Sequence, residues 1–326
     1  MTSTAELQED YKMAKTKILI CGASGFIGRN LFEYFYSHSR FETFGTYFRS
    51  KPIISRPRLF QADLRVKEGA LWATQGMDIV INCAAMTDGM GVYNPATYVP
   101  PNLQINQNLT EAAFTNKVRH FIFLSCTVMY PSSTKPLKEH EHDPENVHPK
   151  YRMPALMKMS GEDLCRIYAK LGTTKYTAIR HTNIYGPYDK FDLVRGHVLA
   201  ATIQKVMASD KEAISIWGQG QESRDFMHVE DLVDFIEHAI SRQGGSFEIF
   251  NAGYGITYTV NQLVDTIIRC SRKDLKVIHD LTKPSIETCM RINVEKARKA
   301  LGWQAKVNLV NGISQTIKWY EQNHPR

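Results

Sequence analysis

Short apolar runs recur along the chain, and stretches with a helical spacing of apolar residues separate them. The runs that predict strands lie at 18–20, 43–48, 59–64, 78–85, 120–125, 176–180 and 247–250. Strands that are apolar on both faces are typical of parallel sheets covered by helices on both sides. The pattern therefore predicts an α/β fold with a Rossmann-type doubly wound parallel sheet. In such a sheet, ligands bind at the carboxyl ends of the strands.

The segments between the runs predict the helices. They lie at 30–36, 102–116 and 154–171. The last of these starts at Pro154, where a proline costs nothing because its missing N–H would be unpaired in any case. Residues 131–149 are rich in proline and charge and are expected to form a loop. A second, glycine-containing loop is expected at 87–91.

The alternation of strand and helix loosens beyond residue 187. We expect a short, polar and mobile extension at 1–15, followed by a dinucleotide-binding domain at 16–186. A returning strand of the sheet is expected near 227–251. The remaining segments, 187–226 and 252–326, are expected to form a smaller C-terminal substrate-binding lobe over the strand ends, and a cleft between the lobes would suit a small molecule.

Three glycines follow the first apolar run with the spacing G-x-x-G-x-x-G, and a helical pattern continues from them. Strand, glycine turn and helix are the context of a dinucleotide site. Gly22 permits the tight turn, Gly25 lets a pyrophosphate approach the backbone, and Gly28 lets helix and strand pack closely. The unpaired N–H groups at the helix start attract the phosphates. We expect this cofactor-binding turn to comprise Gly22, Ser24, Gly25, Phe26, Ile27 and Gly28.

The second predicted strand ends without an acidic residue, which would otherwise accept hydrogen bonds from the ribose of NAD. Arg49 and Lys51 follow instead and could pair with a 2′-phosphate, so NADP(H) is favoured and NAD(H) remains open. A solvated basic loop is the alternative for these two residues. Further cofactor contacts are expected near the ends of the next strands, at Asp63, Leu64, Ala84 and Ala85.

The amino-acid composition argues against several classes of protein. The chain is 43% hydrophobic and 22% charged, as in soluble globular proteins. No run of about 18 apolar residues predicts a membrane span, and we expect no secretion signal. The net charge of +7 comes without a lysine and arginine block interleaved with aromatic residues, so nucleic acid is not expected as a partner. The six cysteines lack metal-ligand spacing, which favours a reduced, cytoplasmic protein without a metal site.

These motifs resemble those of the extended short-chain dehydrogenases/reductases, the NAD-dependent epimerase/dehydratase group that modifies nucleotide sugars. The resemblance spans roughly residues 16–322. It is carried by the three glycines, by Asp63 and Leu64, by the strand end 125–130, by Lys158 with Gly161 and Glu162, and by the segments 183–187, 224–231 and 301–303. The resemblance also implies that the helices at 102–116 and 155–170 pair across a twofold axis in a four-helix bundle, which would make the protein a homodimer.

Within that group, the segment 182–191 with His197 is most similar to the GDP-L-fucose synthases. Those enzymes epimerise C3 and C5 of a GDP-4-keto-6-deoxymannose and then reduce C4 with NADPH. The resemblance therefore implies a nucleotide-linked, GDP-linked sugar as the substrate. The substrate-binding residues that it implies are Asn183, His197, Lys205, Trp217 and Arg224.

The reactive centre of the family is Tyr-x-x-x-Lys, one turn apart on the same face of a helix. The lysine holds the nicotinamide ribose, and the tyrosine exchanges a proton with the substrate. Lys158 fits the lysine, but Pro154 stands at the tyrosine position and has no proton to give. Cys126 replaces a serine or threonine partner, and Val128 stands where an epimerising cysteine is expected. The other epimerising group, His197, is present.

Three interpretations follow from these departures. A substitute group supplies the proton; or the protein catalyses a narrower step at one carbon without epimerisation; or it is a non-catalytic nucleotide-sugar or dinucleotide binder with a regulatory or structural role. The main hypothesis is an NADP(H)-preferring oxidoreductase that acts at C4 of the sugar. Its candidate catalytic residues are Lys158, His197, Tyr151, Cys126 and Thr127. A purely structural role is the alternative for His197, Tyr151 and Cys126.

Overall fold

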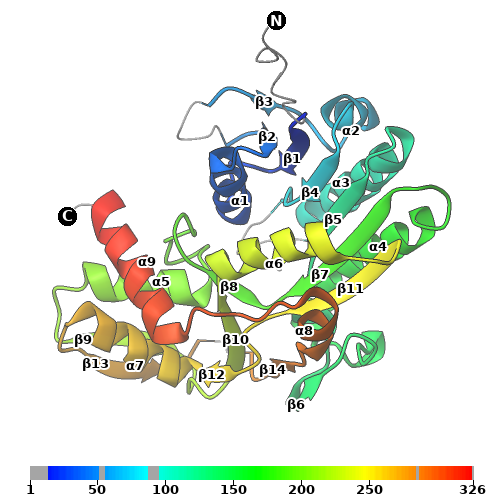
Figure 1. The fold of residues 1–326 in the computed structure, drawn as a ribbon. Coiled ribbons are helices and arrows are strands. Elements are labelled where there is room, and N and C mark those ends of the chain that lie inside the picture. The colour runs from blue at the N-terminus through cyan, green and yellow to red at the C-terminus, as the bar shows by residue number, and fades with distance from the viewer. Residues whose placement is uncertain (1–13, 51–55, 87–94, 284–285, 325–326) are drawn as a thin grey trace, which may run out of the picture.

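The computed structural model describes residues 14–50, 56–86, 95–283 and 286–324. The expected extension at 1–15 lies outside these ranges except for its last two residues, and the expected loop at 87–91 and Lys51 lie wholly outside them. Figure 1 shows a large α/β part and a smaller lobe beside it. None of the described helices is both long and apolar enough to cross a membrane.

Within the described residues, seven strands form one parallel sheet in the order β11-β7-β5-β4-β1-β2-β3. They are β1 (Thr16–Cys21), β2 (Phe41–Tyr47), β3 (Leu59–Gln61), β4 (Ile79–Asn82), β5 (His120–Cys126), β7 (Lys175–His181) and β11 (Phe247–Ala252). All of them lie where the apolar runs predict strands, so the doubly wound sheet is confirmed. The chain changes direction across the sheet between β1 and β4, which is where ligands bind in such folds. The ends of β1, β4, β5 and β7 are called the carboxyl edge below.

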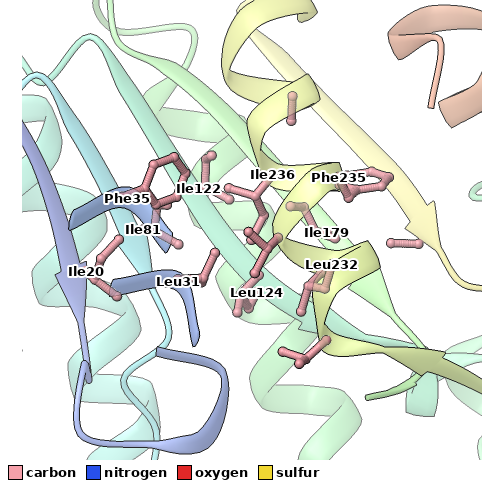
Figure 2. Packing of buried hydrophobic residues seen from close by; sticks show 14 of the residues in the cluster. Ile20, Leu31, Phe35, Ile81, Ile122, Leu124, Ile179, Leu232, Phe235 and Ile236 are labelled. Carbon is pink, nitrogen blue, oxygen red and sulfur yellow. The ribbon is translucent and has the colours of Figure 1, made fainter. Parts of the chain in front are cut away.

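Helices cover both faces of this sheet (Figure 1). One face carries α1 (Phe26–Ser37), α6 (Val229–Arg242) and α8 (Glu295–Leu301), and the other carries α2 (Lys67–Thr74), α3 (Pro95–Thr115) and α4 (Arg152–Tyr168). Figure 2 shows the first face, where Phe35 of α1 and Ile236 of α6 lie beside Ile122 of β5, all fully buried. Burying each such side chain contributes about 1.5–3 kcal/mol, so the helices are held firmly over the strands that lead to the carboxyl edge.

The smaller lobe has a hydrophobic core of its own. It contains α5 (Val198–Ala208), α7 (Val260–Ser271), α9 (Leu309–Asn323) and the parallel pair β9 (Ala213–Trp217) and β13 (Lys276–Asp280). A further sheet joins β12 (Thr257–Thr259), β10 (Ser223–His228), β14 (Cys289–Ile292) and β6 (Ser133–Leu137), and β8 (Asn183–Tyr185) pairs with β10. Because β8 follows β7 almost directly in the chain, this lobe begins at the carboxyl edge.

The structure corrects two predictions around α4. The segment 131–149 is not simply a loop, because Ser133–Leu137 forms β6 and pairs with the distant β14, and two short 3₁₀ turns follow at Pro144–Asn146 and Pro149–Tyr151. Pairing with a distant strand satisfies backbone groups in a way that the local sequence does not indicate. The helix α4 begins at Arg152, so Pro154 is its third residue, still within the turn whose N–H groups are unpaired.

The sequence pattern assigned the whole segment 252–326 to the smaller lobe, and the structure corrects this prediction. Ala297 and Leu301 of α8 and the following Trp303 are buried in the core of the large sheet. The Trp303 ring packs edge-on against Phe235 with 4.7 Å between the ring centroids. The returning strand is confirmed as β11, which pairs with β7.

Candidate functional site

The glycine turn after β1 is built as its spacing predicts. Gly22 has a φ of +79°, and a Cβ there would lie 2.9 Å from the Cα of Ala84. At Gly28, a Cβ would lie 2.2 Å from the backbone oxygen of Gly22. At Gly25, a Cβ would meet only that oxygen among the described atoms, at the ordinary contact distance of 3.4 Å. The fold itself therefore requires glycine at 22 and 28, whereas Gly25 leaves a stretch of backbone open to a ligand.

The start of α1 fits the pyrophosphate of a dinucleotide. Gly25 is the N-cap and supplies no side-chain cap, and the first turn holds no acidic residue. The first N–H groups of the helix thus lack intrahelical partners and carry the positive end of the helix dipole. Phe26 and Ile27 pack their side chains against the core, so they would meet a phosphate through their backbone. Ser24 is partly exposed in the turn itself.

Cationic side chains gather after β2 and β3. The guanidinium carbons of Arg49 and Arg65 lie 5.3 and 4.3 Å from the ring centroid of Phe48. Arg65 donates to both carboxylate oxygens of Asp63, from Nε at 2.8 Å and from Nη2 at 2.6 Å. These bonds from Arg65, with a smaller effect of Arg49, hold the pKa of Asp63 below its ordinary value. The structure thus brings the predicted residues Arg49 and Asp63 together, and adds Arg65.

The chain leaves β4 close to the glycine turn. The N–H of Ala84 donates to the side-chain oxygen of Asn82 at 3.1 Å, which fixes the exit from the strand, and Ala85 is exposed. Leu64 differs from its prediction, because its side chain is 5% exposed and packs in the core shared with α2, α3 and α4. A cofactor contact of Leu64 would therefore have to come from its backbone.

Lys158 lies at the carboxyl edge. Its Nζ donates to the backbone oxygen of Leu124 at 2.6 Å, close to the end of β5. Burial lowers the pKa of this ammonium group, while the neighbouring thiols of Cys126 and Cys83 act in the opposite direction. Burial raises the pKa of both thiols in turn, so they stay protonated.

The candidates for replacing the absent tyrosine are not equally placed. Pro154 is buried in the first turn of α4. Tyr151 precedes that helix and packs in a small apolar cluster around Met129. Thr127 is 5% exposed. Packing thus favours structural roles for Tyr151 and Thr127, whereas Cys126 ends β5 at the carboxyl edge and is partly exposed.

His197 immediately precedes α5, and its side chain is 73% exposed. Its Nδ1 lies 3.5 Å from Oδ1 of Asp189, whose own side chain is 2% exposed. The hydrogen bond with Asp189 raises the pKa of His197. The other carboxylate oxygen of Asp189 is buried and has no hydrogen-bond partner among the described residues. Asp189 therefore orients His197 and favours its protonated form, and the sequence did not indicate this residue.

Three predicted substrate residues lie along the smaller lobe. Lys205 of α5 donates from Nζ to the backbone oxygen of Ser215 at 2.6 Å, and burial lowers its pKa. Trp217, at the end of β9, is 51% exposed. Asn183 donates to the backbone oxygen of Asp225 at 3.2 Å and so ties β8 to β10. Trp217 thus offers the most open surface of the three for a ligand.

Arg224 joins two parts of the smaller lobe. Its side chain is largely buried, with 9% of the residue exposed. The guanidinium group donates to the backbone oxygens of Ser223, Ile286 and Thr288 at 2.9, 3.0 and 2.5 Å. These bonds tie β10 to the segment before β14. They use three of the N–H donors of the side chain, so the predicted substrate contact of Arg224 would depend on the others.

A buried ion pair holds α4 against β5 and β7. Arg180 donates to both carboxylate oxygens of Glu162, at 2.9 and 2.6 Å, and the two side chains are 1% and 3% exposed. Ser125 donates to the same carboxylate at 2.6 Å, and Arg180 also donates to the hydroxyl of Tyr130 at 2.9 Å. Because Glu162 lies one helical turn after Lys158, this network sets the position of the lysine.

Two further titratable side chains lie at this site, and the sequence pattern did not indicate them. His181 ends β7 as the register partner of Cys126. Tyr98 of α3 is close enough to act electrostatically on the same thiol, and burial raises its pKa to about 12. His181 directly precedes the motif segment 182–191, but no periodicity marks it as part of the site. Within the described ranges, no cluster of His, Cys, Asp and Glu side chains could hold a metal ion.

Comparisons with known proteins agree with this geometry. The profile described as "NAD dependent epimerase/dehydratase family" matches residues 18–253. The chain is 30% identical to putative GDP-L-fucose synthase 2 of Arabidopsis thaliana over 260 residues, which is 78% of this chain and 79% of that protein. It is 26% identical to GDP-L-fucose synthase of Escherichia coli strain K12 over 328 residues, which is 96% of this chain and 99% of that protein.

Among solved structures, a GDP-6-OMe-4-keto-L-xylo-heptose reductase from C. jejuni matches with a TM-score of 0.83. The match covers 95% of this chain and 99% of that chain at 20% sequence identity. At this identity, the structural likeness shows the fold alone. The evidence for a family comes from the profile and from the sequence relatives.

Proposed function

The chain belongs to the NAD dependent epimerase/dehydratase family, and from that premise we propose that it is an oxidoreductase acting on a GDP-linked sugar. The proposed reaction is oxidation or reduction at C4 of the sugar with a nicotinamide cofactor, with or without epimerisation. The observation that carries the proposal is the position of Lys158, whose ammonium group lies at the end of β5 on the same sheet edge as the glycine turn.

Each part of the site has a role in this proposal. When it is bound, the nicotinamide cofactor supplies or accepts a hydride. The glycine turn and the start of α1 bind its pyrophosphate, and Lys158 holds the ribose next to the reacting carbon. Asn183, Lys205, Trp217 and Arg224 line the path of the nucleotide sugar. His197, whose pKa the hydrogen bond with Asp189 raises, donates to the sugar.

The alternative of a non-catalytic binder has less support. A protein that only binds nucleotide sugars has no need of a lysine placed at the strand ends or of a histidine with an orienting carboxylate, and this chain has both. The loss of the tyrosine weakens general acid–base catalysis, which is worth about 10²–10⁴-fold in rate, and leaves hydride transfer in place.

The direct test is turnover by the purified chain. NADPH is mixed with a panel of GDP-4-keto sugars, and NADP⁺ is mixed with GDP-L-fucose and with GDP-mannose, while the absorbance of the reduced nicotinamide is followed. We expect turnover with at least one sugar. Lys158→Met should lower kcat/KM by about 10²-fold or more, because the ribose loses its anchor. Lys318→Met, on the exposed side of α9, is the matched control and should behave as wild type. No turnover with any sugar would contradict the proposal.

We propose NADP(H) as the preferred cofactor, because Arg49 and Arg65 flank the end of β2. Arg49→Glu is expected to weaken NADPH binding by about tenfold to a hundredfold and to leave NADH binding nearly unchanged, because charge-assisted hydrogen bonds to the 2′-phosphate are worth about 1.5–3 kcal/mol. Titration calorimetry with both cofactors measures this, and Lys318→Glu controls for the change in net charge. An equal loss of affinity for both cofactors would show that Arg49 does not bind the 2′-phosphate.

We also propose a homodimer built through α3 and α4. Leu156 and Ile167 of α4 are 50% and 53% exposed. They line a surface hollow of about 500 Å³ together with Met159, and this hollow shares no residue with the carboxyl edge. Exposed apolar residues grouped in this way mark interfaces, and twofold symmetry is the commonest assembly.

All six cysteines are free thiols, which supports the proposed cytoplasmic location.

A further inference from the structure

No tyrosine hydroxyl stands one turn before Lys158, so the proton of the reaction must be carried by a side chain from another element. β5 and β7 are parallel neighbours, and Cys126 and His181 are register partners at their ends. Their Cα atoms are therefore separated by one strand spacing of about 4.8 Å. The imidazole of His181 thus stands next to the position of the serine or threonine partner that the family resemblance assigns to Cys126.

The hydrogen bond of His181 decides which ring nitrogen can react. Its Nδ1 lies 2.8 Å from the backbone oxygen of Thr182. A carbonyl oxygen can only accept, so Nδ1 carries a proton in either charge state. In the neutral ring, Nε2 therefore presents its lone pair. Nε2 forms no hydrogen bond with the part of the chain that the structure describes, and the side chain is partly exposed.

The surroundings of this ring keep it neutral, with the lone pair of Nε2 available. Lys158 of α4 and His197, which precedes α5, both act on His181, and Cys126 of β5 stays a neutral thiol because burial raises its pKa. Burial, together with the two cations, lowers the pKa of His181 to about 4, whereas Asp189 raises the pKa of His197. Two histidines at one site with opposite pKa shifts are typical of a base paired with an acid.

Building on the proposed function, we propose that Nε2 of His181 carries the proton of the redox step in place of the family's tyrosine. During oxidation, Nε2 accepts the proton of the sugar hydroxyl while the C–H bond at the same carbon breaks. Its electron pair leaves as a hydride to the nicotinamide, and the C–O bond becomes a carbonyl. During reduction, the protonated ring returns this proton to the carbonyl oxygen as the carbon receives the hydride. The neutral ring at pH 7 suits the oxidation direction.

Tyr98 is the strongest competitor for this role, since the Cys126 thiol acts electrostatically on it. Burial and that thiol raise the pKa of Tyr98 to about 12. A group that transfers protons near neutral pH works best with a pKa of about 7, and the pKa of His181 lies nearer to that value than the pKa of Tyr98 does. His181 is therefore the better suited of the two side chains.

The test compares His181→Gln, which can still form hydrogen bonds but cannot carry a proton, with Tyr98→Phe and a matched control. The control is His238→Gln, because His238 of α6 has the same kind of contact, with its Nδ1 2.8 Å from the backbone oxygen of Asp234. We expect His181→Gln to lower kcat by about 10²–10⁴-fold with KM and NADPH affinity unchanged. Added imidazole should restore turnover to His181→Ala. His238→Gln should keep the wild-type kcat, and Tyr98→Phe should lower kcat far less than His181→Gln does.

A second measurement does not depend on turnover. Nitrogen-15 spectra of the histidine rings in the complete chain should show His181 protonated at Nδ1 at neutral pH, and GDP-L-fucose with NADP⁺ should shift its Nε2 signal. A proton on Nε2 in the neutral ring, an Nε2 signal that the ligands do not move, or a wild-type kcat in His181→Gln would overturn this inference and leave the proposed function intact. A wild-type chain without turnover on any sugar would overturn both.

Discussion

Replacing Glu162 with glutamine is expected to lower the free energy of unfolding by about 3–5 kcal/mol, because the charge of Arg180 then stays buried without its counter-charge. Arg180 is 1% exposed and gives two of its hydrogen bonds to this carboxylate. Its remaining acceptors, which include the hydroxyl of Tyr130, carry no full charge. Urea denaturation followed by circular dichroism measures the loss.

Two further variants separate this effect from a general sensitivity of the fold. Arg180→Met combined with Glu162→Gln should recover part of the stability, since no unpaired charge is then buried. Glu111→Gln removes a carboxylate from the surface pair with Lys67, whose side chain is 55% exposed, and should cost less than about 1 kcal/mol. If Glu162→Gln and Glu111→Gln destabilise the chain equally, the buried network stabilises the fold no more than a surface ion pair does.

Placing an aspartate at Gly25 is expected to abolish cofactor binding without harming the fold. Gly25 is the N-cap of α1 with an extended backbone, φ −81° and ψ 171°, and a Cβ there meets no severe contact. Aspartate is a preferred N-cap, and its negative charge stabilises a helix start. The same charge would occupy the position of the pyrophosphate and repel it. We expect an unchanged or higher melting temperature and at least about a hundredfold weaker NADPH binding.

The matched control for this variant is Gly244→Asp, because a Cβ at Gly244 meets no described atom within 4 Å. It adds the same charge away from the glycine turn and should leave NADPH binding unchanged. Calorimetry and a thermal melt of both variants decide the question. NADPH binding of wild-type strength by Gly25→Asp would mean that the pyrophosphate does not lie over the glycine turn.

The glycine turn of the candidate site could be predicted from the sequence because its signals are local. Gly22, Gly25 and Gly28 fall within seven consecutive residues, and their spacing alone fixes the turn, the open backbone and the helix contact that the structure shows. Arg49 was predicted for the same reason, as the residue that follows a strand. Arg65 was not predicted, because only the turn that follows β3 brings its side chain to the site.

The side chains that we propose to carry protons could be predicted only in part, since His197 was indicated by its motif and His181 was not. The missing tyrosine was visible at Pro154. Two of the predicted substitutes, Tyr151 just before Pro154 and Thr127 beside Cys126, are held mainly by packing in the structure. His181 comes to the site through the register of β7 against β5. Asp189 comes to His197 through the fold of the segment between β8 and α5.

By itself, the sequence determined the seven strands of the large sheet, the helices α1, α3 and α4 and the glycine turn, since apolar periodicity and glycine spacing act within a few residues of one another. The tertiary structure alone decided that β6 pairs with β14, that α8 and Trp303 belong to the core of the large sheet, and that the guanidinium group of Arg224 is bound by backbone oxygens. These contacts join residues far apart in the chain, and their register depends on the packing of whole elements, which no local pattern encodes.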